Sequence, residues 1–258
     1  MYKLTKDEYN KLLNESITAT YKKVNNDIDK RINLDGKAII TDSIIKDRMF
    51  KNGQDNSFIT LKDHKANFEN NPKVRLINPA KNEIGRISKA ILDKINKNLK
   101  NIMKVNQWKD SSEVITWFKQ IDDKSKHKFI IFDIKDFYPS ISKSLLQKAL
   151  EFAKSKVTIE PEEENIISHS RKLLLYNNNQ AWVKKGTEFF DVTMGAYDGA
   201  EICELIGVFM LNKLQTKYDK KNFGLYRGRW FRDFKKHVWP SIREGKERYK
   251  SNFQRRRT

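Results

Sequence analysis

The chain of 258 residues has few of the residues that cross-link small domains through disulfides or metal ions. It has one cysteine, Cys203, so an internal disulfide framework and a cysteine-based zinc site are excluded. We expect Cys203 to be a small, buried apolar residue on a helix rather than a reactive thiol. The four histidines have no paired ligand spacing, and none is assigned to a metal: His64, His127, His169 and His237.

Long hydrophobic runs and a net negative charge are absent as well. No apolar stretch approaches the roughly 20 residues that span a bilayer, and the first seven residues, MYKLTKD, do not open a secretory signal. Lysine and arginine number 52 against 33 acidic residues, which gives a net charge of +19. A field of that sign suits a polyanion such as nucleic acid. We therefore expect an intracellular protein without a membrane partner; the choice between cytoplasm and nucleus and the oligomeric state stay open.

The hydrophobic pattern predicts helices mixed with a few short strands. It indicates one or two amphipathic helices in the first fifty residues and further helices over residues 85–104, 111–121, 142–153, 161–175 and 200–214. Two strands are predicted at residues 58–61 and 74–77, and a hairpin from residues 182–184 and 189–192. The apolar run at residues 129–132 predicts a fully buried central strand. The expected fold class is α+β with a small antiparallel sheet.

The segment FDIKDFYPSIS places Asp133 at the C-terminal end of that strand. A carboxylate held rigidly at a sheet edge suits Mg²⁺, because a hard cation prefers oxygen ligands in fixed positions. The alternative is that Asp133 caps the next helix or turn. The segment alone leaves both open.

This segment resembles the first palm motif of reverse transcriptases, in which a strand ends in a metal-binding aspartate and an aromatic residue follows five positions later. The resemblance implies that Asp133 is a metal ligand, with the carbonyl of Ile134 beside it. It also implies that Tyr138 is a steric gate, whose ring lies under the sugar and favours deoxynucleotides. A packed core aromatic is the alternative for Tyr138.

A second segment, MGAYDGA at residues 194–200, resembles the turn-then-helix motif of the same family. There a glycine lets the backbone approach the template base and the nascent pair, as only a residue without a side chain can. Gly195 takes that role by resemblance. Met194 stands where glutamine is commoner, and Gly199 and Ala200 stand where the family has Ser-Pro, so the details of template contact are left undecided.

Residues 58–89 are similar to the finger region of the family, where basic side chains on a hairpin hold the incoming triphosphate. The resemblance makes Arg75 a triphosphate ligand, with Lys62 or Lys65 as a second. A guanidinium fork pairs well with phosphate oxygens.

Taken in order along residues 55–227, these motifs imply a right-hand polymerase with helix-rich fingers and an incomplete palm. The implied activity is RNA-directed DNA synthesis of the mobile-element type, with Mg²⁺ or Mn²⁺ as cofactor and with an RNA or DNA template-primer and deoxynucleoside triphosphates as partners. The chain then divides into a helical extension (1–54), a fingers-like region (55–125), a partial palm (126–227) and an aberrant basic tail (228–258).

The third palm motif of the family, aromatic-x-Asp-Asp, is broken in this chain. After Tyr226 and Arg227 the sequence continues with Gly228, Arg229 and Trp230, so both aspartates are missing. If Gly-Arg-Trp is encoded GGA-CGA-TGG, reading from the second nucleotide gives Asp-Asp, which suggests a frameshift as a hypothesis. We expect the metal site to be incomplete, the chain to be inactive as a polymerase and the tail to be poorly packed. The alternatives are a non-catalytic nucleic-acid-binding remnant and a structural protein whose charge only solubilises it.

Overall fold

The computed structural model describes residues 3–41, 55–63, 68, 72–186, 189–226 and 229–235, and for residues 132, 220 and 229–235 it describes the backbone only. The chain forms two compact units. The first comprises Met1–Lys104 and Asp136–Phe209, and the second comprises Val105–Lys135 and Met210–Thr258. The four ranges expected from the sequence divide the chain in its linear order and stay a prediction.

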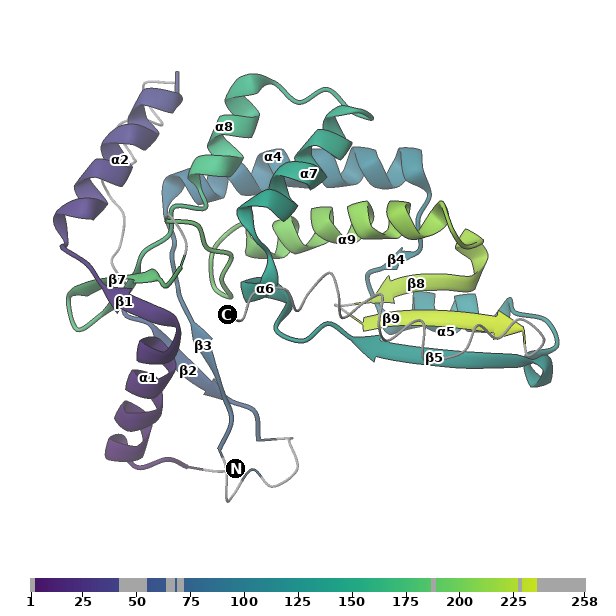
Figure 1. The fold of residues 1–258 in the computed structure, drawn as a ribbon, viewed down its shortest axis with the longest axis horizontal. Coiled ribbons are helices and arrows are strands. Elements are labelled where there is room, and N and C mark those ends of the chain that lie inside the picture. The colour runs from purple at the N-terminus through teal and green to yellow at the C-terminus, as the bar shows by residue number, and fades with distance from the viewer. Residues whose placement is uncertain are drawn as a thin grey trace. The chain divides into compact units, whose positions relative to one another are not determined.

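The first unit opens with α1 (Lys6–Thr20), β1 (Tyr21–Lys23) and α2 (Asp27–Ile39), as Figure 1 shows. Thr5 and Glu8 form a capping box that satisfies free N–H groups at the start of α1. Leu13 and Ile17 of α1 pack against an antiparallel hairpin of β2 (Phe58–Leu61) and β3 (Val74–Ile77). Both strands have the predicted bounds.

The described part of the first unit also contains α4 (Glu83–Met103), α6 (Phe137–Ser140), α7 (Lys143–Lys154), α8 (Pro161–His169) and α9 (Gly199–Gln215). The buried face of α4 contains Ile95 and Leu99, as the apolar spacing predicts, together with Leu92, whereas Ile102 of the same apolar pattern is 53% exposed. The last residues of α9 belong to the second unit. The predictions of α4, α7 and α9 are confirmed within about two residues.

A three-stranded sheet of order β1-β7-β6 also belongs to the first unit. Its hairpin joins β6 (Leu175–Asn177) to β7 (Gln180–Lys184) and turns at Asn178 and Asn179, which both have positive φ. The predicted hairpin from 182–184 and 189–192 is therefore wrong, as is a helix running to residue 175. Asparagine tolerates the left-handed region, so the asparagine pair was the better turn signal.

The described part of the second unit is a four-stranded sheet on which α5 (Ser111–Lys119) and the end of α9 pack. Its strands lie in the order β4 (Gln107–Trp108), β8 (Phe223–Tyr226), β9 (Arg229–Lys235) and β5 (His127–Asp133); β4 and β8 are parallel and the other neighbours antiparallel. Two 3₁₀ turns lead into strands of this sheet, Lys124–Lys126 before β5 and Lys220–Asn222 before β8. The helix α5 packs on the sheet, with Trp117 against Trp108 at 5.1 Å between ring centroids and Phe118 against Phe129 at 5.0 Å.

The strand that ends in Asp133 is an edge strand, and the prediction of a fully buried central strand is wrong. Among the described residues β5 pairs only with β9, and Ile131 is 63% exposed while Phe129 is 37% exposed. An apolar run indicates a strand here correctly, but it does not show how many faces the rest of the chain covers.

The chain beyond residue 228 was expected to be poorly packed. Residues 229–235 instead form β9, which pairs along its length with β5 and continues the hairpin from β8. Alternating aromatic and basic residues in this segment suit a strand whatever their origin. The rest of the tail lies outside the described residues.

Helices mixed with small, mainly antiparallel sheets confirm the expected α+β class. In the part of the chain that the structure describes, no helix is both long and apolar enough to cross a membrane.

Candidate functional site

The turn that carries Gly195 lies against the end of β3 in the first unit. The amide of Asn78 donates to the carbonyl of Met194 at 3.0 Å. Gly195 has φ of +106°, and a side chain there would lie 2.5 Å from the carbonyl oxygen of Asn78 and 3.0 Å from Cγ2 of Ile77. Both the backbone angle and the close approach require glycine.

The same stretch of β3 presents Arg75. In the β2–β3 register Arg75 lies opposite Thr60 and Ile77 opposite Phe58, so these four residues share one face of the hairpin. The other face carries Ile59 and Leu76, which join the core with α1. Arg75 is partly exposed, and its neighbour Ile77 touches Gly195, so the structure brings Arg75 and Gly195 onto adjoining parts of one surface.

Of the two lysines considered with Arg75, Lys62 follows β2 and its amide donates to the carbonyl of Lys73 at 2.8 Å across the hairpin. It is partly exposed. Lys65 lies outside the described residues.

Tyr138 sits in α6, and its ring packs on the start of α9. A side chain at Gly199 would lie 3.3 Å from ring carbon Cε1 of Tyr138, and the phenol hydrogen-bonds Cys203 one turn further along. Burial, followed by the charges of Cys203 and Glu201, raises the pKa of the Tyr138 phenol to about 12. The side chain of Tyr138 therefore packs on α9 and remains partly exposed.

Two buried aspartates, which the sequence reasoning did not single out, fix the segment that contains Gly195. Asp191 accepts from the hydroxyl of Tyr21 at 2.6 Å and pairs with Lys184 at 3.1 Å. Lys184 also donates to the carbonyl of Pro139 at 3.0 Å, which ties the residue after Tyr138 to the same network.

The second anchor is Asp198, which immediately precedes α9. It accepts from the hydroxyl of Ser170 at 2.8 Å and forms an ion pair with Arg171. Both side chains of the ion pair are at most 1% exposed. An aspartate just before a helix usually indicates an N-cap, which is why the sequence alone did not reveal this buried pair.

Replacing Gly195 by alanine is expected to lower the free energy of unfolding by about 2–4 kcal/mol, because strain at positive φ adds to a clash with backbone. Gly186→Ala is the matched control, since Gly186 has φ of +70° but nothing within 4 Å of the added carbon. It is expected to cost about 1 kcal/mol. Urea denaturation measures both, and equal losses would contradict the close contact at Asn78.

Cys203 is expected to react slowly with alkylating reagents. Burial is the largest cause that raises the pKa of its thiol, to about 12, so the reactive thiolate is scarce at pH 8. Relative to an exposed thiol, the fall in thiolate is roughly a thousandfold. Because Cys203 is the only cysteine, the rate of iodoacetamide labelling reports on it directly. The side chain of Cys203 on α9 is partly buried, where the sequence predicted a buried residue. The chain unfolded in urea is the control, and a native rate equal to the unfolded rate would contradict the raised pKa of the thiol.

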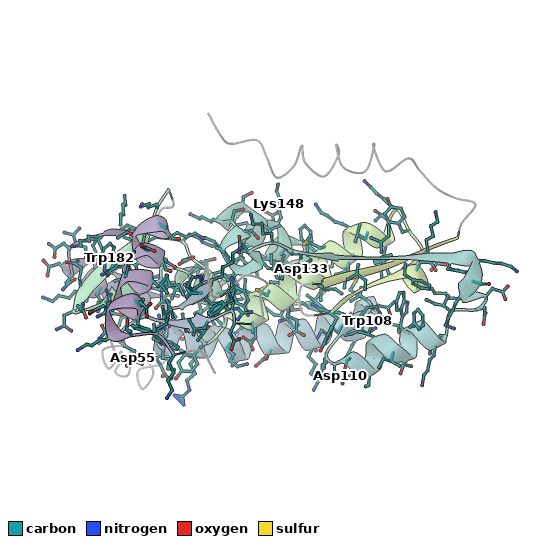
Figure 2. The ribbon with its side chains drawn as sticks, turned by 90° about the horizontal axis from the view of Figure 1, so that it is seen from below. Asp55, Trp108, Asp110, Asp133, Lys148 and Trp182 are labelled. Atoms are coloured by element: carbon teal, nitrogen blue, oxygen red, sulfur yellow. The ribbon has the colours of Figure 1, made fainter. Side chains whose placement is uncertain are left out.

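In the second unit Asp133 ends β5 and is exposed (Figure 2). Its partner in the β5–β9 register is Arg229, and Tyr226 of β8 is the other partner of Arg229. Ile134, whose carbonyl the resemblance places beside the metal, packs its side chain on Leu211, Phe223 and Leu225. This contact holds the residue after β5 against β8 and the end of α9.

The donor groups around Asp133 do not fit a resident Mg²⁺ ion. Among the described side chains no group of three histidine, cysteine or acidic residues gathers anywhere, and the position opposite Asp133 is a cationic residue. Mg²⁺ keeps several waters and is usually held by one or two carboxylates together with substrate phosphates, and a cationic residue opposite Asp133 opposes such a site.

Comparisons with known proteins add to this geometry. No family model matches the chain, and no curated protein matches it. Among solved structures it is similar to telomerase from Candida albicans in complex with a fragment of telomeric RNA, with a TM-score of 0.57 and 11% identity over 95% of this chain and 43% of that one. The fold is reverse-transcriptase-like. Telomerase from Candida tropicalis gives the same likeness, with TM-scores of 0.53 for a form truncated from its C-terminal domain and 0.51 for the apo form.

In both Candida tropicalis structures the identity is 12%; they match 94% and 96% of this chain and 50% and 46% of their own. The chain therefore spans half or less of the length of the telomerase chains that it matches. At this identity the likeness concerns the fold, so the roles of individual residues remain expectations.

Proposed function

We propose that this chain is a nucleic-acid-binding domain with a reverse-transcriptase-like fold that does not polymerise as its sequence stands. The proposal is supported by the hairpin face that carries Arg75 and Ile77, because Ile77 packs against the exposed turn of Gly195. A guanidinium suits phosphate. Gly195 is exposed, although the space that its side chain would take is filled by the carbonyl of Asn78. The net charge of +19 adds long-range attraction to a polyanion.

In this proposal Arg75 and Lys62 contact phosphate groups and Tyr138 lies beside the sugar of a bound nucleotide. The partners are a template-primer of RNA or DNA and deoxynucleoside triphosphates. The similar Candida albicans telomerase was solved with RNA, which supports a nucleic-acid partner. A right-hand arrangement and an origin in a mobile element belong to the same proposal and rest on the sequence motifs.

Catalysis is not part of the proposed function, because Asp133 lies opposite Arg229 in the sheet register. Two-metal nucleotidyl transfer needs carboxylates that hold both ions against the attacking and leaving oxygens. A cation at that position repels the ions that the reaction requires. The parent activity by resemblance is RNA-directed DNA synthesis, and its expected loss rests on the two missing aspartates of the third motif, at positions 228 and 229.

Replacing Arg75 by alanine is expected to weaken binding of an RNA–DNA hybrid roughly tenfold and to lower the salt slope of log Kd by about 1, because one phosphate contact is lost. Arg31→Ala on the exposed face of α2 is the matched control, with the same loss of charge. It is expected to change affinity less than threefold.

Fluorescence anisotropy over a range of salt concentrations measures both variants. If the parent chain does not bind the hybrid at physiological ionic strength, the proposal fails and the reading as a structural α+β protein is favoured. Equal losses of affinity from Arg75→Ala and Arg31→Ala would show that binding depends on net charge and not on a defined surface.

A further inference from the structure

The buried ion pair of Arg171 and Asp198 lies under the turn that presents Gly195. We propose that this pair is a positioning device for nucleic-acid binding: it fixes the turn at residues 194–199 rather than adding to stability. This inference deepens the proposed function and rests on it.

The turn has two attachments with different properties. At its start, the amide of Asn78 donates to the carbonyl of Met194, a single backbone bond. At its end, Asp198 is held through both carboxylate oxygens, one by Ser170 and one by Arg171. The carbonyl of Asp198 meanwhile accepts from Ile202 and starts α9. The ion pair therefore sets where the turn stops and where the helix begins.

The energetics indicate that stability does not explain the pair. Arg171 is 0% exposed, and its Nη1 has no hydrogen-bond partner among the described residues. Removing two charges from water costs several kcal/mol for each, and a buried pair offsets this only when every donor is satisfied. An apolar pair of similar volume is often neutral or more stable. What the charged pair adds is a directional constraint that an apolar pair lacks.

The Arg171–Asp198 ion pair is also linked to the residues that contact Tyr138. Arg171 lies close enough to Cys203 for its charge to act on the thiol, and Cys203 hydrogen-bonds the phenol of Tyr138. Through Asp198 the same arginine holds the residue next to Gly199, against which the Tyr138 ring packs. Arg171 is therefore linked both to the turn of Gly195 and to Tyr138, the two features that the proposed function places against a bound nucleotide.

The test compares charge-neutral double variants of the full chain. Arg171→Met with Asp198→Leu removes the buried pair, and Lys94→Met with Glu163→Leu removes a more exposed pair of 3.2 Å as the matched control. The midpoint of thermal unfolding, the affinity for an RNA–DNA hybrid with a single-stranded template overhang, and the rate of Cys203 labelling are measured for each.

The buried double variant is expected to melt at or above the parental midpoint and to bind the hybrid roughly tenfold more weakly, because misplaced contacts lower affinity without unfolding the chain. It is expected to label more slowly at Cys203, because the charge of Arg171 no longer lowers the pKa of the thiol. The control is expected to leave affinity and labelling at parental values. A folded double variant with parental affinity would overturn the inference.

If the double variant does not fold, the single variant Arg171→Lys tests the inference instead. It keeps the charge and loses the planar fork, so its expected affinity lies between those of the parent and a tenfold loss. A folded Arg171→Lys chain with parental affinity and labelling would also overturn the inference. If the parent itself does not bind the hybrid, the proposed function has failed first, and the unmutated baseline shows this separately.

Discussion

Gly228→Asp combined with Arg229→Asp is expected to confer Mn²⁺ binding and primer extension that the unmutated chain is expected to lack. The exchange removes the cation opposite Asp133 and puts a carboxylate in its place, beside a second one at position 228. If two bound ions contribute about 4 kcal/mol to the transition state, the rate rises by roughly a thousandfold. Isothermal titration with Mn²⁺ and primer extension on an RNA template measure the two effects.

Two controls make this result specific. Gly228→Asn with Arg229→Asn removes the same cation and keeps similar side-chain volume, but it supplies no charged ligand, so it is expected to stay inactive. Asp133→Asn added to the double aspartate variant is expected to abolish both metal binding and extension, because the first ligand is lost. Primer extension by the unmutated chain at the rate of the double aspartate variant would contradict the account of the broken motif.

Asp198→Asn alone is expected to lower the free energy of unfolding by about 3–5 kcal/mol, since it leaves the buried guanidinium of Arg171 without its counter-charge. Urea denaturation followed by tryptophan fluorescence measures the loss. The matched control is Asp93→Asn, which breaks an exposed pair with Lys89 on α4 and is expected to cost less than about 1 kcal/mol.

If Asp198→Asn lowers the free energy of unfolding no more than Asp93→Asn does, the guanidinium of Arg171 reaches water or another acceptor. The ion pair would then not anchor the turn. The contrast with the apolar double variant is informative. Breaking the pair from one side leaves a buried charge, whereas removing both partners leaves none, so the two variants are expected to differ widely in stability.

Much of the secondary structure followed from local sequence. The strands at residues 58–61 and 74–77 and the helices α4, α7 and α9 have bounds close to the predicted ones, because apolar periodicity and capping residues act within a few positions along the chain. Errors occurred where one segment depends on another. The helix predicted to reach residue 175 ends at His169, and the next apolar residues join a sheet with β1 from the start of the chain.

For the candidate site, local sequence indicated chemistry but not placement. The motif residues Asp133, Tyr138, Gly195 and Arg75 could be named because each belongs to a short pattern with a chemical reason behind it. Their environments came from the fold. Gly195 meets the end of β3, Tyr138 meets α9, and Asp133 pairs in register with Arg229, all through contacts between segments distant in sequence.

The buried network shows the same limit most clearly. Nothing near Arg171 in the sequence indicates that it is fully buried, and Asp198 has the appearance of a helix cap. An ion pair over 27 positions forms only when both elements are packed, because its energy depends on exclusion of water that neither segment achieves alone. Composition and periodicity therefore decided the class of fold and the net charge of +19, on which the proposed binding of nucleic acid rests. Tertiary packing decided which charges are buried, which strand lies at the edge and what lies opposite Asp133.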